Sequence, residues 1–126
     1  MKFKTLMTIK ALVALGFGPL LLLVPAWLLN LLGMEFSSGA ALTAREYGAA
    51  MMGILIMTWM ARNAEESVAR RAIIWNLYVY DAIGLAATLV LLLKGAMNPL
   101  GWGIAAVYLF FTAGFGYFAH LKKQAG

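Results

Sequence analysis

Four long apolar runs constrain this chain more than any other feature of its sequence. They cover residues 11–32, 40–61, 72–93 and 100–119. Each run has about the 20 residues that an α-helix needs to cross a hydrocarbon core roughly 30 Å thick. None alternates polar and apolar residues as the strands of a membrane β-barrel do. The sequence therefore predicts an all-α fold with four membrane-spanning helices.

The composition excludes an ordinary soluble domain. Of the 126 residues, 63% are hydrophobic and 12% are charged, against about 45–50% and about 25% in soluble domains. A chain this short cannot bury so much apolar surface in its own core, so we expect the lipid bilayer to cover the rest. The length predicts one domain over residues 1–126. The absence of cysteine excludes disulfides, thiolate metal sites and thiol catalysis.

The links between the runs are short, and their charges predict an orientation. Short links favour an antiparallel four-helix bundle. The first run is too long for the apolar core of a signal peptide, so we expect it to be retained. Four crossings place most basic residues on one side, and the positive-inside rule makes that side, with both termini, cytoplasmic. The basic residues form clusters between apolar runs, which argues against nucleic acid as a partner. Those on that side are Lys2, Lys4, Lys10, Arg62, Arg70, Arg71, Lys122 and Lys123.

Two ionisable sites lie inside the predicted helices. Arg45, Glu46 and Tyr47 lie near the start of the second run, and Asp81 lies near the middle of the third. At 1.5 Å per residue, Arg45 is roughly 8 Å below the outer face and Asp81 roughly 18 Å. Side chains of antiparallel helices also lean in opposite directions. We therefore expect Arg45 to reach the outer interface rather than pair directly with Asp81.

Asp81 is the sharper candidate site. Burial disfavours a charged carboxylate, so we expect Asp81 to be protonated and to donate to Thr112 or to the carbonyl that Pro19 frees in the first helix. Asn76 and Tyr78 add polar groups to the same helix. These residues predict either a polar cavity for a proton, ion or ligand headgroup, or a polar cluster that fixes helix packing. We favour packing for Asp81, and leave both interpretations open for Arg45 and Glu46.

Small residues recur at four-residue spacing, which lets helices approach closely. We expect these pairs to pack within the bundle rather than form a dimer interface. The only histidine, His120, is expected at the inner membrane interface, and no metal site is predicted. No phosphate loop, catalytic carboxylate pair, zinc signature or nucleophile elbow is present. The small pairs are Ala44/Gly48, Ala49/Gly53 and Ala82/Ala86.

The stretch from Arg45-Glu46-Tyr47-Gly48 to Gly53, with Pro25 and Leu31-Leu32-Gly33 before it, resembles the DoxX-like superfamily of small bacterial four-helix membrane proteins. The resemblance covers most of the chain in layout but only this stretch in motif. It implies a four-helix bundle in the bacterial inner membrane. Some members are linked to quinone-dependent sulfur oxidation or to redox-complex assembly. The lack of cysteine argues against a thiol-based redox role here.

Three functional hypotheses follow. The first is a non-enzymatic accessory or interaction subunit that works with a membrane protein partner or as a homo-oligomer. The second is a quinone- or lipid-interacting redox component, with Arg45 and Glu46 at the headgroup and Asp81 in proton exchange. The third is a small transporter subunit, which we disfavour because one four-helix protomer leaves little room for alternating access. The first hypothesis needs no cofactor, and the second would need a quinone.

Overall fold

The computed structural model describes residues 1–121, and these residues contain five α-helices, one π-helix and no strand. The all-α prediction is thus confirmed for the described part of the chain. The helices form two compact units, Met1–Arg62 and Asn63–Gly126, here called the N-terminal and C-terminal units. Lys122 and Lys123, two of the residues used to predict orientation, lie outside the described residues.

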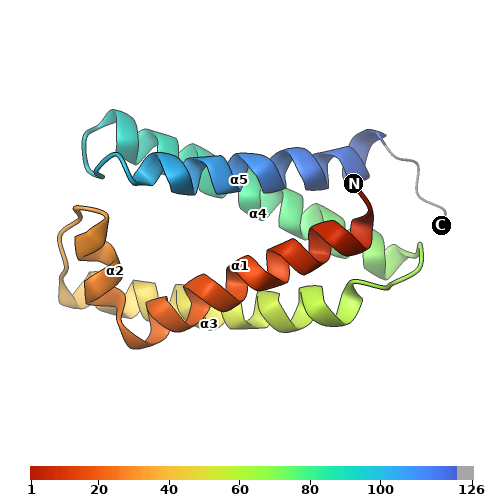
Figure 1. Cartoon of the computed structure of the whole chain (residues 1–126), viewed down its shortest axis with the longest axis horizontal. Coiled ribbons are helices and arrows are strands. Elements are labelled where there is room, and N and C mark those ends of the chain that lie inside the picture. Colours follow the sequence, from red (N-terminus) through yellow and green to blue (C-terminus); the bar gives the residue numbers. More distant parts are fainter. Residues whose placement is uncertain (122–126) are drawn as a thin grey trace. The chain divides into compact units, whose positions relative to one another are not determined.

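The N-terminal unit is a helical hairpin with a short helix at its turn. It contains α1 (Phe3–Leu23), α2 (Pro25–Leu31) and α3 (Ser38–Ala61), and α1 packs along α3 in the antiparallel direction (Figure 1). Ser37 caps α3 by accepting a hydrogen bond from the Ala40 N–H at 3.1 Å. Gly33, with φ +73°, ends α2 in the left-handed conformation that glycine tolerates.

The first predicted helix differs from the structure at both ends. The expected helix over residues 11–32 is instead α1, which begins eight residues earlier at Phe3, followed by the separate α2. Pro25 explains the break, because it has no N–H to continue the ladder and its ring clashes with the preceding turn. The early start follows from the spacing of Phe3, Leu6 and Met7, which form one buried stripe.

Two glycines let the backbones of α1 and α3 approach each other. A Cβ at Gly48 would lie 2.9 Å from the Gly18 carbonyl oxygen and 2.9 Å from both the backbone nitrogen and the Cγ of Leu22. A Cβ at Gly18 would lie 2.9 Å from the sulfur of Met52. The close approach of the backbones therefore requires glycine at position 48, whereas at Gly18 the neighbouring atom is the end of the flexible Met52 side chain.

The C-terminal unit is a second hairpin. It contains α4 (Val68–Leu93), α5 (Gly101–Gly116) and the π-helix η1 (Tyr117–Leu121), and α4 packs against both α5 and η1. Ser67 caps α4 by accepting from the Arg70 N–H at 3.1 Å. At the other end, Gly95 has φ +74°, its N–H donates to the Leu92 carbonyl, and the Ala96 N–H donates to the Leu91 carbonyl.

Tyrosine rings lie on glycines where α4 meets α5. A Cβ at Gly84 would lie 2.3 Å from Cε1 of Tyr108, and a Cβ at Gly116 would lie 3.0 Å from Cε1 of Tyr78. Each helix thus contributes one ring and one glycine to the contact. Tyr80 adds a T-shaped contact with Tyr108, with ring centroids 6.2 Å apart. This packing buries large aromatic surface without moving the helix axes apart.

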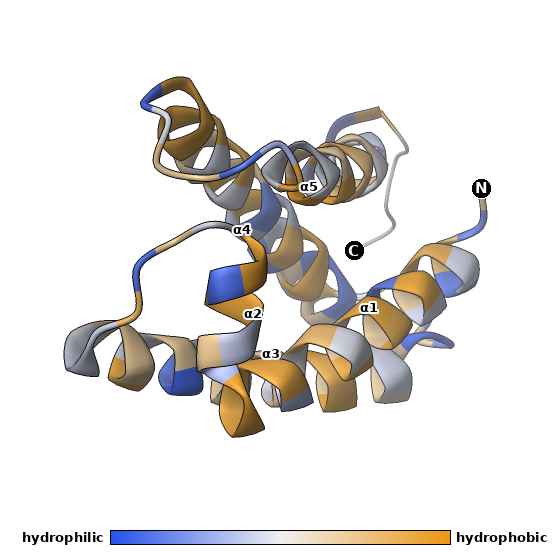
Figure 2. Cartoon of the chain, turned by 60° about the vertical axis from the view of Figure 1, so that its left-hand side comes forward, coloured by the Kyte–Doolittle hydropathy of each residue, from blue (hydrophilic) through white to orange (hydrophobic). Residues whose placement is uncertain are grey.

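Three helical segments are long and apolar enough to cross a membrane: Phe3–Leu23, Val68–Leu93 and Gly101–Leu121. Figure 2 shows hydrophobic residues along the visible length of α1, with hydrophilic residues near the N-terminus. The fourth predicted span, α3, is long enough at 24 residues. It is not among these segments, and Arg45 and Glu46 lower its hydropathy.

Candidate functional site

The predicted site residues lie in both units, on three helices. Those on α3 belong to the N-terminal unit, and those on α4 and α5 belong to the C-terminal unit. None of the predicted residues on α3 is buried, whereas in the C-terminal unit Asp81 is buried and Asn76 is exposed. The residues are Arg45, Glu46 and Tyr47 on α3, Asn76, Tyr78 and Asp81 on α4, and Thr112 on α5.

Arg45 lies against the end of α1. Its Nε donates a hydrogen bond to the Leu22 carbonyl oxygen at 3.4 Å. Leu22 is in the last turn of α1, where carbonyls have no partner inside the helix, and Pro25 prevents the helix from continuing. A cation at this end also interacts favourably with the helix dipole. Arg45 is exposed overall, so its guanidinium contacts α1 and remains accessible at the same time.

Glu46 lies on an uncovered face of α3. Ala49 and Gly53 share this face, since residues three, four and seven apart are neighbours on a helix, and all three are exposed. Nothing lies within 4 Å of the position that a Gly53 Cβ would take. By contrast, Ala44 and Gly48 are buried against α1. Of the pairs Ala44/Gly48 and Ala49/Gly53, only Ala44/Gly48 packs inside the hairpin.

Asp81 is fully buried, on the stripe that also includes Ile74, Leu77 and Thr88. Asn76 is exposed on a different face of α4, so it does not join Asp81 in one polar cluster. Thr112 is half-buried, and its buried hydroxyl oxygen has no hydrogen-bond partner within the described residues. Among the described residues of this unit, the buried polar side chains are therefore Asp81 and Thr88.

Tyr78 belongs to an aromatic cluster that the sequence did not lead us to expect. The His120 ring meets Trp75 and Tyr78 edge to face, at centroid distances of 4.9 and 5.1 Å. Trp75 and Tyr78 themselves are 5.6 Å apart. His120 lies in the π-helical turn η1, a geometry that often occurs at functional positions. The detectable signal was the spacing of three between Trp75 and Tyr78, which puts both rings on one face of α4.

Lys10 also lies at a position that differs from the sequence-based prediction. It was expected before the first helix, but it lies inside α1 and is only 2% exposed. Its spacing from Leu6, Met7 and Ala14 places it on the buried stripe of α1. Among the described residues, Lys10 of the N-terminal unit and Asp81 of the C-terminal unit are both buried ionisable side chains.

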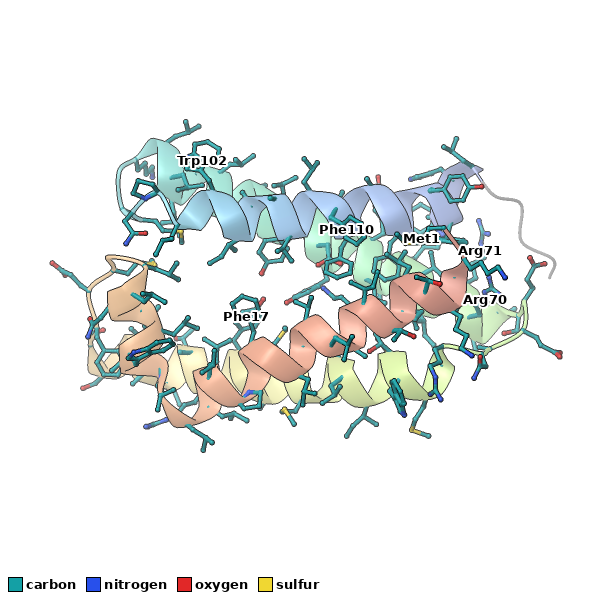
Figure 3. All side chains as sticks on the ribbon, in the orientation of Figure 1. Met1, Phe17, Arg70, Arg71, Trp102 and Phe110 are labelled. Atoms are coloured by element: carbon teal, nitrogen blue, oxygen red, sulfur yellow. The ribbon has the colours of Figure 1, made fainter. Side chains whose placement is uncertain are left out.

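Three arginines lie where α3 ends and α4 begins. Figure 3 shows Arg70 and Arg71 near the start of α4. Arg70 Nη1 donates to the Ala64 carbonyl at 3.0 Å. At the end of α3, the Arg62 guanidinium carbon lies 3.8 Å from the centroid of the Trp59 ring, and Nη1 donates to the Trp59 carbonyl.

The site residues offer charged and aromatic groups for recognition of another molecule. Within residues 1–121, no three His, Cys, Asp or Glu side chains come close enough to hold a metal ion. The exposed groups are the Arg45 guanidinium at the end of α1, the Glu46 carboxyl on α3, and His120 within its aromatic cluster. A scan against protein-family models, a search of curated proteins and a search of solved structures each found no match.

Proposed function

We propose that this chain is an accessory or interaction subunit of the bacterial inner membrane, and that it docks another membrane protein on the outer face of α3. In this proposal α3 is a fourth span, and both termini are cytoplasmic. Three apolar helical segments support membrane insertion. The positions of Lys2, Lys4, Arg62, Arg70 and Arg71 support the orientation. The DoxX-like resemblance supports the four-helix arrangement.

The observation that carries the proposal is the uncovered face formed by Glu46, Ala49 and Gly53. Small residues let another helix approach closely, and polar groups strengthen such contacts in lipid. An ionisable side chain on a spanning helix is costly to leave facing hydrocarbon, so it normally finds a polar partner. Glu46 is exposed and Gly53 has open space around it. This combination fits the docking of a helix that carries a donor opposite Glu46.

The absence of native cysteine makes this face directly testable. Gly53→Cys and Ala49→Cys, each as the only cysteine, would be treated in native membranes with a short thiol-reactive photocrosslinker. We expect each to give one discrete adduct with a second polypeptide. Leu109→Cys is the matched control, because Leu109 is 57% exposed on α5 and should give none. A Glu46→Leu background should reduce the Gly53→Cys adduct several-fold.

Each other outcome has a defined meaning. An adduct with a second copy of this chain would identify the partner as a homo-oligomer. Crosslinks confined to this chain's own peptides would place the α3 face inside the bundle and overturn the docking proposal. Equal labelling of lipid at Gly53→Cys and Leu109→Cys would do the same. A stoichiometric quinone after purification with native lipids would favour the redox hypothesis instead.

A further inference from the structure

A groove between α1 and α3 has a purely apolar lining. It has a volume of about 430 Å³ and is lined by side chains from residues 11–15 of α1 and residues 55–60 of α3. Ala11 is buried at the α1 side, and its small side chain leaves room between its larger neighbours. The volume falls within the roughly 300–1,000 Å³ of sites that bind small molecules. The lining residues are Ala11, Leu12, Leu15, Leu55, Ile56, Trp59 and Met60.

The groove is open to its surroundings. Leu12 and Ile56 are each 59% exposed, and Met60 is 76% exposed. Neither hairpin helix covers these side chains, so a molecule from outside the N-terminal unit can reach them. In water such a patch would be costly. Inside a bilayer the available apolar occupant is an acyl chain.

One end of the groove carries positive charge. Trp59 lines the groove, and the Arg62 guanidinium stacks on its ring at 3.8 Å. Because α1 and α3 are antiparallel, the start of α1 with Lys2 and Lys4 lies at the same end of the hairpin as Arg62 (Figure 1). Both lysines are exposed. The groove is therefore apolar along its length and has cationic side chains at one end.

We propose that this groove is a binding site for an anionic phospholipid, with one acyl chain between α1 and α3 and the phosphate at Arg62. A guanidinium binds phosphate oxygens through two parallel N–H bonds, which favours arginine at such sites. The indole of Trp59 holds the guanidinium in place and also contacts the upper part of the chain. A lipid with net negative charge, such as phosphatidylglycerol, gains from Arg62, Lys2 and Lys4. Zwitterionic phosphatidylcholine carries its own compensating cation.

Trp59 provides the measurement. In a Trp27→Phe, Trp75→Phe, Trp102→Phe background, Trp59 is the only tryptophan. The full chain would be reconstituted in vesicles that contain phosphatidylglycerol or phosphatidylcholine with brominated chains, at equal mole fractions. We expect Trp59 to be quenched at about fivefold lower mole fraction of the anionic lipid, as expected for one basic residue near an anionic headgroup. Soluble glycerol phosphate should not reverse the quenching, because the apolar groove binds the chain.

Arg62 variants test the assignment of the headgroup site. Arg62→Gln should bring the ratio of the quenching mole fractions of the two lipids close to one. Arg62→Lys should keep part of the preference for the anionic lipid. Lys94→Gln is the matched control, because Lys94 is an exposed cation in the other unit, and it should keep the full ratio. Equal quenching by both lipids in the starting protein, an unchanged ratio in Arg62→Gln, or competition by glycerol phosphate would overturn the proposal. If the protein with three tryptophans replaced does not fold, native mass spectrometry of the unaltered chain measures the relative binding of the same two lipids.

This inference rests on different side chains from the docking proposal, although Ile56 and Met60 of the groove continue the face of Gly53 along α3. The lipid groove involves Arg62 and Trp59, whereas docking involves Glu46, Ala49 and Gly53. Loss of the lipid preference would leave the Gly53→Cys adduct unchanged, and loss of the adduct would leave the lipid preference unchanged.

Discussion

The two hairpins both use glycine at the helix contact, but for different partners. In the N-terminal unit, Gly48 makes room for backbone atoms of α1. In the C-terminal unit, Gly84 makes room for the ring of Tyr108, and Gly116 for the ring of Tyr78. A backbone contact cannot yield without moving a helix, whereas a ring can rotate about its own bonds. The same residue type should therefore tolerate substitution very differently in the two units.

The largest effect is expected at the buried carboxyl of the C-terminal unit. Asp81→Lys places a longer side chain of opposite charge at a position that is 0% exposed, and burying an unsuited charge costs several kcal/mol. We expect no folded Asp81→Lys protein in the membrane fraction, measured by immunoblot and by size-exclusion chromatography in detergent. Asp81→Asn keeps the shape and a polar group, and should accumulate normally.

The control is Glu65→Lys, because Glu65 is exposed outside the helices and the substitution should have no effect on accumulation. Normal accumulation of Asp81→Lys would contradict its burial. It would also mean that substitution of the buried Asp81 costs less stability than substitution at the glycine contact of the N-terminal unit.

A second prediction concerns the backbone contact of the N-terminal unit. Gly48→Ala would bring a Cβ to 2.9 Å from the Gly18 oxygen and the Leu22 nitrogen, so α1 and α3 must separate. We expect a loss of about 2–3 kcal/mol, the upper part of the range for overpacking, measured by thermal unfolding in detergent. Leu22→Ala should not restore stability, because the backbone atoms would remain.

Gly53→Ala is the matched control on the same helix. Nothing lies within 4 Å of its new Cβ, and alanine favours a helix over glycine by about 1 kcal/mol. The substitution should leave stability unchanged or raise it slightly. Equal losses at both positions would mean that the loss reflects glycine itself rather than the contact with α1.

The sequence predicts the helices better than it predicts their contacts. The runs over residues 40–61 and 72–93 lie within α3 and α4, because hydrophobicity and length are local properties of a segment. The contact partners depend on how each helix is rotated about its axis, which an apolar run does not record. Asn76 was predicted to join Asp81 in one polar cluster, but the two lie on different faces of α4. Lys10 was expected outside the first helix, because a lysine after two other lysines suggests a flanking charge rather than a buried stripe.

The smallest expected effect is at the ring contact of the C-terminal unit. In Gly84→Ala, the new Cβ would overlap the Tyr108 ring at 2.3 Å from Cε1, but the ring lies at the end of a flexible side chain and can turn away. We expect a loss of about 1 kcal/mol, the low end for overpacking. The double variant Gly84→Ala, Tyr108→Leu should be more stable than the sum of the two single losses predicts, by at least about 0.5 kcal/mol of coupling. This rescue by a side-chain substitution separates the ring contact from the backbone contact at Gly48, where none is expected. Strict additivity in thermal unfolding of the four proteins would show that Tyr108 is not what limits side-chain size at Gly84.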